Sequence, residues 1–149
     1  LQGRKLPVYG DGKNVRDWLY VDDHAKAIDM VQEKGRLGER YNIGGHNEKQ
    51  NIEIDRTILD TLQEMLPEGD PRKALVSHDL ITYVEDRKGH DRRYAIAPDK
   101  IKAEIGWYPK TMFKEGIRLT IQWFFEHEDW MKNVTSGDYQ KYYEEMYKA

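Results

Sequence analysis

Residues 6–28 read LPVYGDGKNVRDWLYVDDHAKAI and carry the local signals that decide the fold class. The first half is rich in turn formers, and Asp11-Gly12 is a pair typical of a hairpin turn. Residues 15–21 alternate aromatic and branched side chains, which predicts a short strand. Asp22 stands where a helix N-cap belongs, and apolar residues then recur at helical spacing up to Gly35. The stretch therefore predicts a turn, a short strand and a helix in succession.

Further along the chain, short strands and helices continue to alternate. The apolar residues of 52–66 recur every three to four positions, which predicts an amphipathic helix, and Asn51 stands at its N-cap. The other expected elements are strands at 40–43, 80–84 and 93–96 and helices at 100–105, 112–127 and from Asp138 onward. Short strands interleaved with several helices predict an α/β domain of α+β-like character.

The composition excludes several classes of protein. The 149 residues allow one ordinary domain, and the net charge of −3 argues against a nucleic-acid partner. A mean hydropathy of −0.92 and the lack of a long apolar run argue against a membrane span. The chain has no cysteine, so it has no disulfide, no thiolate zinc site and no cysteine nucleophile. This composition suits a cytoplasmic protein.

Motifs for cofactor and metal binding are missing from the sequence. No Gly-rich dinucleotide turn follows a predicted strand, and no P-loop or HExxH motif occurs. The run Asp22-Asp23-His24 has the chemistry of metal ligands, but side chains of neighbouring residues at a helix start point in different directions. We interpret this run as a cap with favourable charges for the helix dipole. The sequence thus predicts no metal site.

Two loops combine arginine, glycine and aromatic residues. One spans residues 7–18 and the other spans residues 86–93. Arginine presents a rigid fork of donors that fits phosphate oxygens, and Tyr9 and Trp18 offer rings that stack on a base or a sugar. The pattern indicates an anionic, ring-bearing ligand such as a nucleotide. The alternative is that these Arg and Asp residues form surface ion pairs, which stabilise a protein little.

Three segments narrow the assignment: RDWLYV at 16–21, GGHNEKQN at 44–51 and DRKGHDRRYAI at 86–96. Together they resemble the C-terminal part of the dTDP-glucose 4,6-dehydratase family, within the extended short-chain dehydrogenases/reductases. The resemblance covers essentially all 149 residues, including SGDY at 136–139. It implies that residues 1–149 form the small C-terminal lobe, a nucleotide-sugar-binding domain. The N-terminal NAD-binding Rossmann lobe of the family is absent from this chain.

The resemblance also implies which residues meet the substrate. These are Pro7, Val8, Tyr9, Arg16, Asn51, Asp86, Arg87, Lys88, Gly89, His90 and Tyr139. In the family, Arg16 binds the diphosphate, and the loop 86–90 closes over the nucleotide with Arg87 as its principal cation. Asn51 has a competing role as a helix N-cap. Lys88 stands where the family usually has proline, so we expect a less rigid and more cationic loop.

The activity that the resemblance implies is a hydride relay. NAD serves as cofactor while dTDP-glucose becomes dTDP-4-keto-6-deoxyglucose with loss of water, in deoxysugar pathways such as that to dTDP-rhamnose. In the family, the tyrosine of a Tyr-x-x-x-Lys motif and an acid–base pair of carboxylates do this work, and we expect neither in this chain. We therefore expect no catalytic, cofactor-binding or metal-binding residue here, no turnover by this piece alone, and a homodimeric parent enzyme.

Two alternatives stay open at this point. The first is the equivalent lobe of a related sugar-nucleotide epimerase or decarboxylase. The second is a free-standing nucleotide-sugar-binding module without catalytic function. A Gly-rich turn and a Tyr-x-x-x-Lys motif upstream of Leu1 would favour the dehydratase over the binding module.

Overall fold

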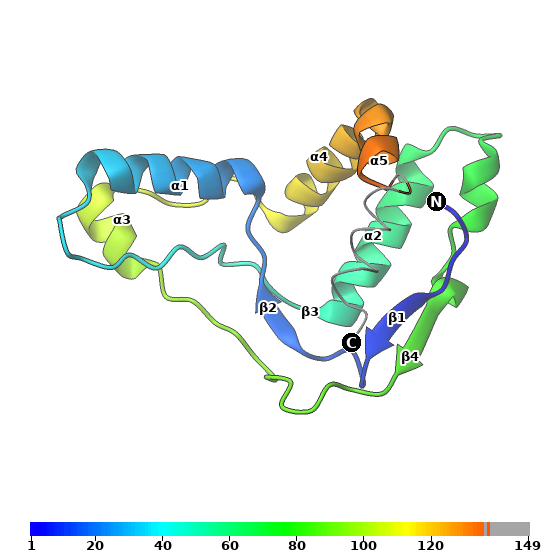
Figure 1. Ribbon diagram of the computed structural model, residues 1–149, viewed down its shortest axis with the longest axis horizontal. Coiled ribbons are helices and arrows are strands. Elements are labelled where there is room, and N and C mark those ends of the chain that lie inside the picture. The colour runs from blue at the N-terminus through cyan, green and yellow to red at the C-terminus, as the bar shows by residue number, and fades with distance from the viewer. Residues whose placement is uncertain (136, 138–149) are drawn as a thin grey trace. The chain divides into compact units, whose positions relative to one another are not determined.

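The computed structural model describes residues 1–135 and 137, which fall into two compact units. The first unit is Leu1–Ile117 and the second begins at Arg118. Their boundary lies within helix α4 (Phe113–Glu126), which is drawn in Figure 1. The first unit holds all the strands of the described residues and is the one that positions the candidate site.

Short strands and helices alternate through the first unit. Its strands are β1 (Leu6–Tyr9), β2 (Val15–Asp17), β3 (Glu48–Gln50) and β4 (Ile81–Val84). Its helices are α1 (Val21–Lys34), α2 (Asn51–Met65) and α3 (Asp99–Ile105), with two 3-10 turns at Pro71–Leu75 and His78–Leu80. The expected α/β class is confirmed.

The described strands form two separate two-stranded sheets. Strand β1 runs parallel to β4, with Leu6 opposite Ile81 and Tyr9 opposite Val84, and the two strands lie side by side in Figure 1. Strand β2 runs antiparallel to β3. Because β1 and β4 are parallel, the segments that follow Tyr9 and Val84 leave from the same end of the sheet. This brings two distant loops of the sequence together.

One apolar cluster of the core lies between α1 and α3. Ala27, Ile101, Ile105 and Trp107 are buried there and contact one another. Trp107 also donates its indole N–H to the carbonyl oxygen of Asp23 at 3.2 Å, so its polar atom is satisfied. Helix α3 ends at Gly106, whose φ of 78° is the left-handed conformation that glycine adopts without strain.

The side chain of Asp17 links β2 to a distant turn. Its Oδ2 accepts the Gly45 N–H at 2.7 Å and its Oδ1 accepts the Asn47 N–H at 2.8 Å. Asn47 Oδ1 in turn accepts the Phe113 N–H at 3.2 Å, at the start of α4. A Cβ atom on Gly45 would lie 2.1 Å from the Trp18 carbonyl oxygen, so only glycine fits this close approach. We call Asp17, Gly45 and Asn47 the Asp17 network.

Two expected strands are absent from the structure. Residues 40–43 are irregular: Tyr41 and Ile43 pack toward the core cluster, and no strand of the described residues pairs with them. Residues 93–96 contribute a single isolated bridge, between Arg93 and Val15. Both predictions were wrong for the same reason, since alternation of side chains describes an extended segment and does not supply its partner. Strand β3 was not predicted.

Turns and caps also differ from the expectation in detail. The Asp11-Gly12 turn joins β1 to β2, but each of these strands pairs elsewhere, so the turn closes no hairpin. Helix α1 begins at Val21, and Tyr20, rather than Asp22, takes the N-cap position. Helix α2 has Gln50 at its N-cap, with Glu53 accepting the Gln50 N–H at 2.9 Å. Asn51 is therefore the first helical residue and not the cap.

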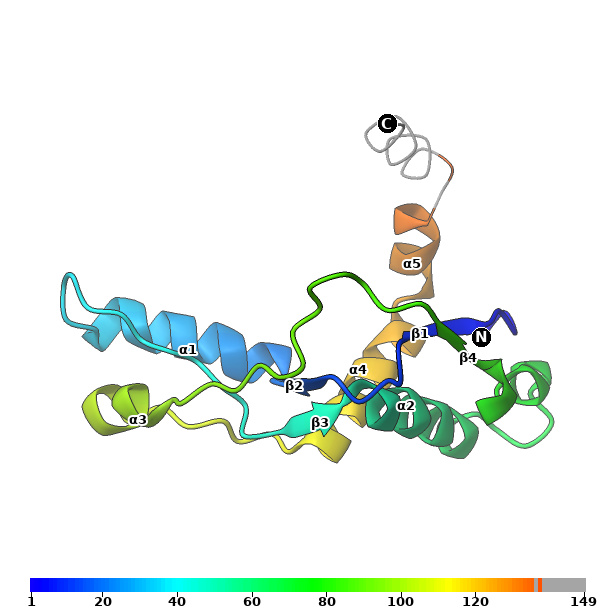
Figure 2. The same ribbon diagram turned by 90° about the horizontal axis from the view of Figure 1, so that it is seen from below.

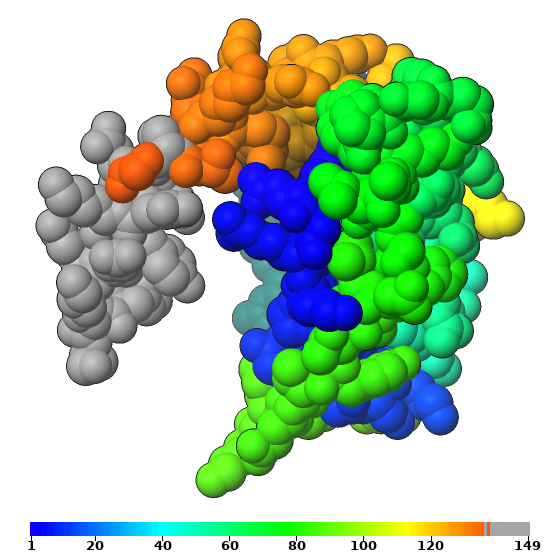
Figure 3. Space-filling view, turned by 90° about the vertical axis from the view of Figure 1, so that its right-hand side faces the viewer, coloured from blue at the N-terminus to red at the C-terminus, as the bar shows by residue number. Residues whose placement is uncertain are grey.

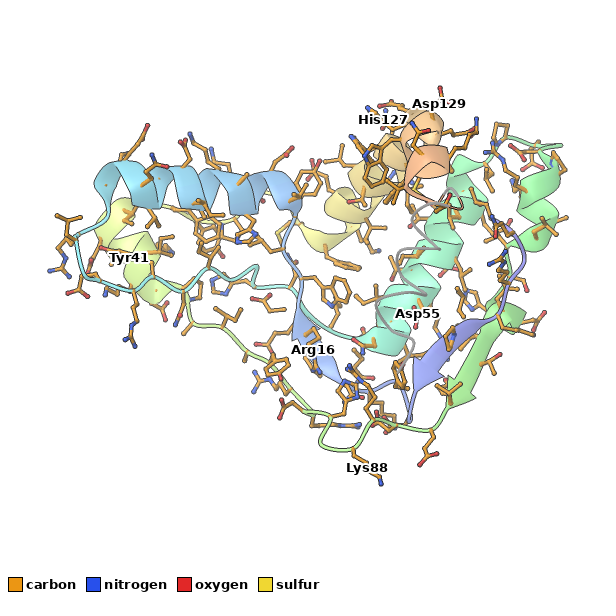
Figure 4. The ribbon with its side chains drawn as sticks, in the orientation of Figure 1. Arg16, Tyr41, Asp55, Lys88, His127 and Asp129 are labelled. Carbon is orange, nitrogen blue, oxygen red and sulfur yellow. The ribbon has the colours of Figure 1, made fainter. Side chains whose placement is uncertain are left out.

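The second unit contains the rest of α4 and helix α5 (Glu128–Val134), which was not predicted. Trp123 lies at the centre of an aromatic cluster, with the ring of His127 stacked on it at 4.3 Å and Trp130 edge-on at 5.2 Å. Figure 4 labels His127 in this unit. The helix expected from Asp138 lies outside the described residues. Across the part of the chain that is described, no helix combines the length and apolar character needed to cross a bilayer.

Candidate functional site

An open pocket of about 320 Å³ lies where β2 meets the long segment after β4. It is lined by Arg16, Arg87, Lys88, Gly89, His90, Asp91 and Tyr94, and we call it the arginine pocket. Figure 4 labels Arg16 beside β2 and Lys88 at the tip of the loop, where its side chain points outward. In the space-filling view of Figure 3, this light-green loop projects from the lower edge of the face shown.

Main-chain hydrogen bonds hold the loop against β2. The Val15 N–H donates to the Arg92 carbonyl at 2.8 Å, and the Tyr94 N–H donates to the Val15 carbonyl at 3.1 Å. The Asp91 carbonyl accepts from Arg16 at 3.0 Å and from the Asn14 side chain at 3.2 Å. Figure 2 shows the segment crossing β2 on its way from β4 to α3. The anchoring explains why Arg87 lies near Arg16 despite their separation in sequence.

The arginines of the two loops have different partners. Arg92 pairs with Asp11 at 2.8 Å, and Arg93 pairs with Glu48 at 2.8 Å. Arg16 instead donates to the carbonyls of Val15 and Asp91, and Arg87 contacts the ring of His90. Within residues 1–135 and 137, neither Arg16 nor Arg87 forms an ion pair with a carboxylate. Among the described residues, these two guanidinium groups therefore have no carboxylate in direct contact.

Aromatic rings lie against both of these guanidinium groups. The Arg16 Cζ lies 4.3 Å from the centre of the Tyr94 ring, and the Arg87 Cζ lies 5.1 Å from that of Tyr9. Each distance is within the range of a cation–π contact, which restricts the orientation of the guanidinium plane. The pocket thus offers two oriented donor groups, the arrangement that suits an anion with several oxygens.

The structure gathers about half of the expected substrate residues at the pocket. Arg16, Arg87, Lys88, Gly89 and His90 line it. Tyr9 and Asp86 lie next to it, since the Tyr9 ring faces His90 edge-on at 6.3 Å and Asp86 hydrogen-bonds His90.

Four expected residues lie elsewhere in the first unit. Pro7 is exposed on β1, and Val8 is 3% exposed and belongs to the core. The Asn51 N–H donates to the Asn14 carbonyl at 3.0 Å, and Asn51 does not line the arginine pocket. Trp18, a candidate for stacking, packs edge-on against Phe113 at 6.4 Å. Tyr139 lies outside the described residues.

Asp91 and Tyr94 line the pocket but were not expected as site residues. The Tyr94 hydroxyl donates to the Asp91 carboxylate, and this hydrogen bond raises the pKa of Tyr94. Both residues belong to the DRKGHDRRYAI segment. Their position beside the arginines of that loop could therefore have predicted them as site residues.

Tyr9 and Lys13 have the spacing of the Tyr-x-x-x-Lys motif, which the sequence interpretation overlooked. A helix brings residues at this spacing onto one face. Here β1 ends at Tyr9, and the Gly12 N–H donates to the Tyr9 carbonyl at 3.0 Å in a tight turn. The Tyr9 ring faces Arg87 and His90. Tyr9 and Lys13 therefore match the motif in spacing alone. They lie in a turn, and the motif requires a helix that places both side chains on one face.

The Asp11–Arg92 ion pair gives a test of the loop anchoring by titration. The hydrogen bond from Arg92 lowers the pKa of Asp11 from its ordinary value of 3.8 to about 2. A lowered pKa means that the ion pair stabilises the folded loop above pH 3.8 and that this stabilisation is lost as the pH falls toward 2. We expect Arg92→Gln to return the Asp11 pKa toward 3.8.

The measurement is the NMR chemical shift of the Asp11 ¹³Cγ. It is followed in the wild type and in Arg92→Gln down to the lowest pH at which each protein stays folded. Asp29 serves as a control, since its carboxylate pairs with Lys26 on α1. An unchanged titration of Asp11 in the variant would show that Arg92 does not hold it.

Comparisons with known proteins agree on one family. The model of the family described as GDP-mannose 4,6 dehydratase matches residues 1–120. The dTDP-glucose 4,6-dehydratase of Shigella flexneri is 51% identical over all 149 residues, and that of Escherichia coli K12 is 49% identical. The chain spans about 40% of the length of these relatives.

Solved structures give the same result. The dTDP-glucose 4,6-dehydratase from Bacillus anthracis, in complex with NAD, superposes with a TM-score of 0.75 at 48% identity, over 89% of this chain and 38% of that one. A dTDP-glucose 4,6-dehydratase from Streptomyces venezuelae, with NAD and TYD bound, gives 0.74 at 39% identity, over 86% and 36%. A UDP-glucose 4-epimerase from Thermotoga maritima gives 0.69 at 28% identity, over 83% and 36%. This chain belongs to the GDP-mannose 4,6 dehydratase family.

Proposed function

We propose that the arginine pocket binds the diphosphate of a nucleotide sugar. We further propose that the whole protein is a dTDP-glucose 4,6-dehydratase, which converts dTDP-glucose into dTDP-4-keto-6-deoxyglucose with loss of water. The observation that carries the first proposal is that two guanidinium groups, Arg16 and Arg87, line one pocket and form no ion pair with a carboxylate of residues 1–135.

The chemistry of a diphosphate matches this arrangement. Its negative charge is spread over several oxygens, and a guanidinium fork donates two parallel hydrogen bonds to such oxygens. Each charge-assisted hydrogen bond contributes about 1.5–3 kcal/mol. Because Arg16 comes from β2 and Arg87 from the loop after β4, the two forks reach a bound anion from different elements. Lys88 adds a third positive charge at the outer edge.

The sequence identities support a dehydratase over an epimerase, because this chain is more similar to the dehydratases. Identity reaches 51% with a dTDP-glucose 4,6-dehydratase and 28% with the UDP-glucose 4-epimerase. The Streptomyces venezuelae dehydratase carries NAD and TYD. These facts favour dTDP-glucose as substrate and NAD as cofactor of the whole protein.

The residues of this chain do not fit an NAD site of their own. The sequence has no Gly-rich dinucleotide turn, and its one Tyr-x-x-x-Lys spacing lies in a turn. NAD, when bound to the whole protein, would supply the hydride chemistry. The part described here would hold and orient the nucleotide diphosphate, and we expect no turnover by the 149-residue piece alone.

The test compares substrates with the full-length protein. We expect NAD-dependent loss of one water from dTDP-glucose, detected by mass spectrometry, and much slower reaction with UDP-glucose and GDP-mannose. A product of unchanged mass with inverted configuration would favour the epimerase. Binding of dTDP-glucose without turnover would favour a non-catalytic module. The absence of binding would contradict the proposal.

A further inference from the structure

Three neighbouring side chains at the arginine pocket form a chain of hydrogen bonds. Asp86 Oδ1 lies 2.6 Å from His90 Nδ1, and His90 Nε2 lies 3.0 Å from the Arg87 terminal nitrogen. The His90 side chain is 6% exposed, whereas that of Asp86 is 40% exposed. The same Asp86 oxygen also accepts the main-chain N–H of Arg87 at 2.8 Å. Asp86 therefore forms hydrogen bonds with both His90 and Arg87.

The chemistry of the three groups fixes where the proton on His90 lies. Asp86 is a carboxylate acceptor, so His90 Nδ1 carries the hydrogen that faces it. A guanidinium has only donors, so His90 Nε2 must be the acceptor of the Arg87 N–H. Both contacts hold together only while the imidazole is neutral with its proton on Nδ1. The hydrogen bond from His90 is also the largest cause that lowers the pKa of Asp86, which keeps this carboxylate ionised.

The turn after β1 fits the position of Asp86. Gly10 has a φ of 58°, and a Cβ atom there would lie 2.8 Å from Asp86 Oδ2. Glycine leaves room for the carboxylate at this point. At the other end of this hydrogen-bond chain, the Tyr9 ring lies against the Arg87 guanidinium. The end of β1 therefore contacts both ends of the hydrogen-bond chain.

We propose that Asp86 is a positioning residue that acts through His90 to orient Arg87 toward the arginine pocket. In this arrangement His90 is a neutral acceptor and not a further cation on the ligand. Asp86, placed by family resemblance among the substrate contacts, then acts on the ligand only through the other two side chains. The inference rests on the proposed function, since the ligand is the diphosphate of dTDP-glucose.

A matched pair of variants separates these roles in the full-length protein. The amide oxygen of a glutamine side chain reaches the position of Nε2, so His90→Gln keeps an acceptor for Arg87. Asparagine reaches only the position of Nδ1, so His90→Asn keeps the contact with Asp86 and loses the one with Arg87. We expect His90→Asn to raise the KM for dTDP-glucose about three- to tenfold with little change in kcat. His90→Gln, which keeps the acceptor for Arg87, should recover most of this loss.

Asp86 is tested in the same assay. Asp86→Ala should match His90→Asn, and Asp86→Asn, which keeps an acceptor oxygen, should restore most of the loss. Equal KM values for the two His90 variants would contradict the proposed hydrogen-bond chain from Asp86 through His90 to Arg87. The ¹⁵N shifts of His90 give a second measurement that needs no substrate, and a proton on Nε2 at neutral pH would also contradict it. Failure of the wild type to convert dTDP-glucose would instead count against the proposed function.

Discussion

Replacement of Asp17 by alanine is expected to lower the free energy of unfolding by about 3 kcal/mol. The Asp17 carboxylate accepts the N–H groups of Gly45 and Asn47, both of which are buried residues. Alanine leaves two buried donors without an acceptor, and each such donor costs about 1–3 kcal/mol. Urea-induced unfolding of the full-length protein measures the loss, and amide exchange at Gly45 and Asn47 localises it.

Asp29→Ala is the matched control for this change. Asp29 lies on the exposed face of α1 and forms an ion pair with Lys26 three positions earlier. Exposed pairs of this kind contribute about 0.2–1 kcal/mol. Equal losses in the two variants would show that the Asp17 network does not stabilise the fold.

Removal of either guanidinium from the arginine pocket is expected to raise the KM for dTDP-glucose at least about tenfold. Arg16→Ala and Arg87→Ala each remove charge-assisted hydrogen bonds to the diphosphate. Binding of NAD should persist in both variants, because the chain carries no dinucleotide motif near these residues. Steady-state kinetics and a separate NAD titration with the full-length protein measure the two effects.

Arg93→Ala supplies the control for charge. Arg93 lies on the same segment as Arg87 but pairs with Glu48, and it does not line the arginine pocket. Its removal should leave the KM within about twofold of the wild type, as is usual for a surface pair. A loss equal to that of Arg87→Ala would mean that the effect is one of overall charge and not of the pocket.

Helices were the most predictable part of the fold. The periodicity of 52–66 and the glycine at 106 gave α2 and the end of α3 to within a residue or two, because both signals are local. Strand pairing was not predictable in the same way. Residues 40–43 alternate like a strand, but no strand of residues 1–135 pairs with them, whereas β3, with the sequence Glu-Lys-Gln, has no apolar pattern and pairs with β2. Whether an extended segment becomes a strand depends on a second segment that pairs with it. The local sequence carries no information about that second segment.

The sequence predicted the types of residue at the candidate site. It did not predict which carboxylates pair with which arginines. Four arginines at 16, 87, 92 and 93 look alike in the sequence. Two of them are neutralised by Asp11 and Glu48, which lie far away along the chain. Only the folded structure shows that Arg16 and Arg87 line one pocket, where no carboxylate of the described residues pairs with them, and that Val8 is buried in the core.

The most direct measurement is a calorimetric titration of the full-length protein with dTDP and with thymidine, for the wild type, Arg16→Ala and Arg87→Ala. Two guanidinium groups that share one diphosphate contribute to the binding of dTDP and not to that of the nucleoside. We expect both variants to lose at least about tenfold in affinity for dTDP and to bind thymidine as the wild type does. Equal losses for dTDP and thymidine, or no loss for dTDP, would contradict a diphosphate site at Arg16 and Arg87.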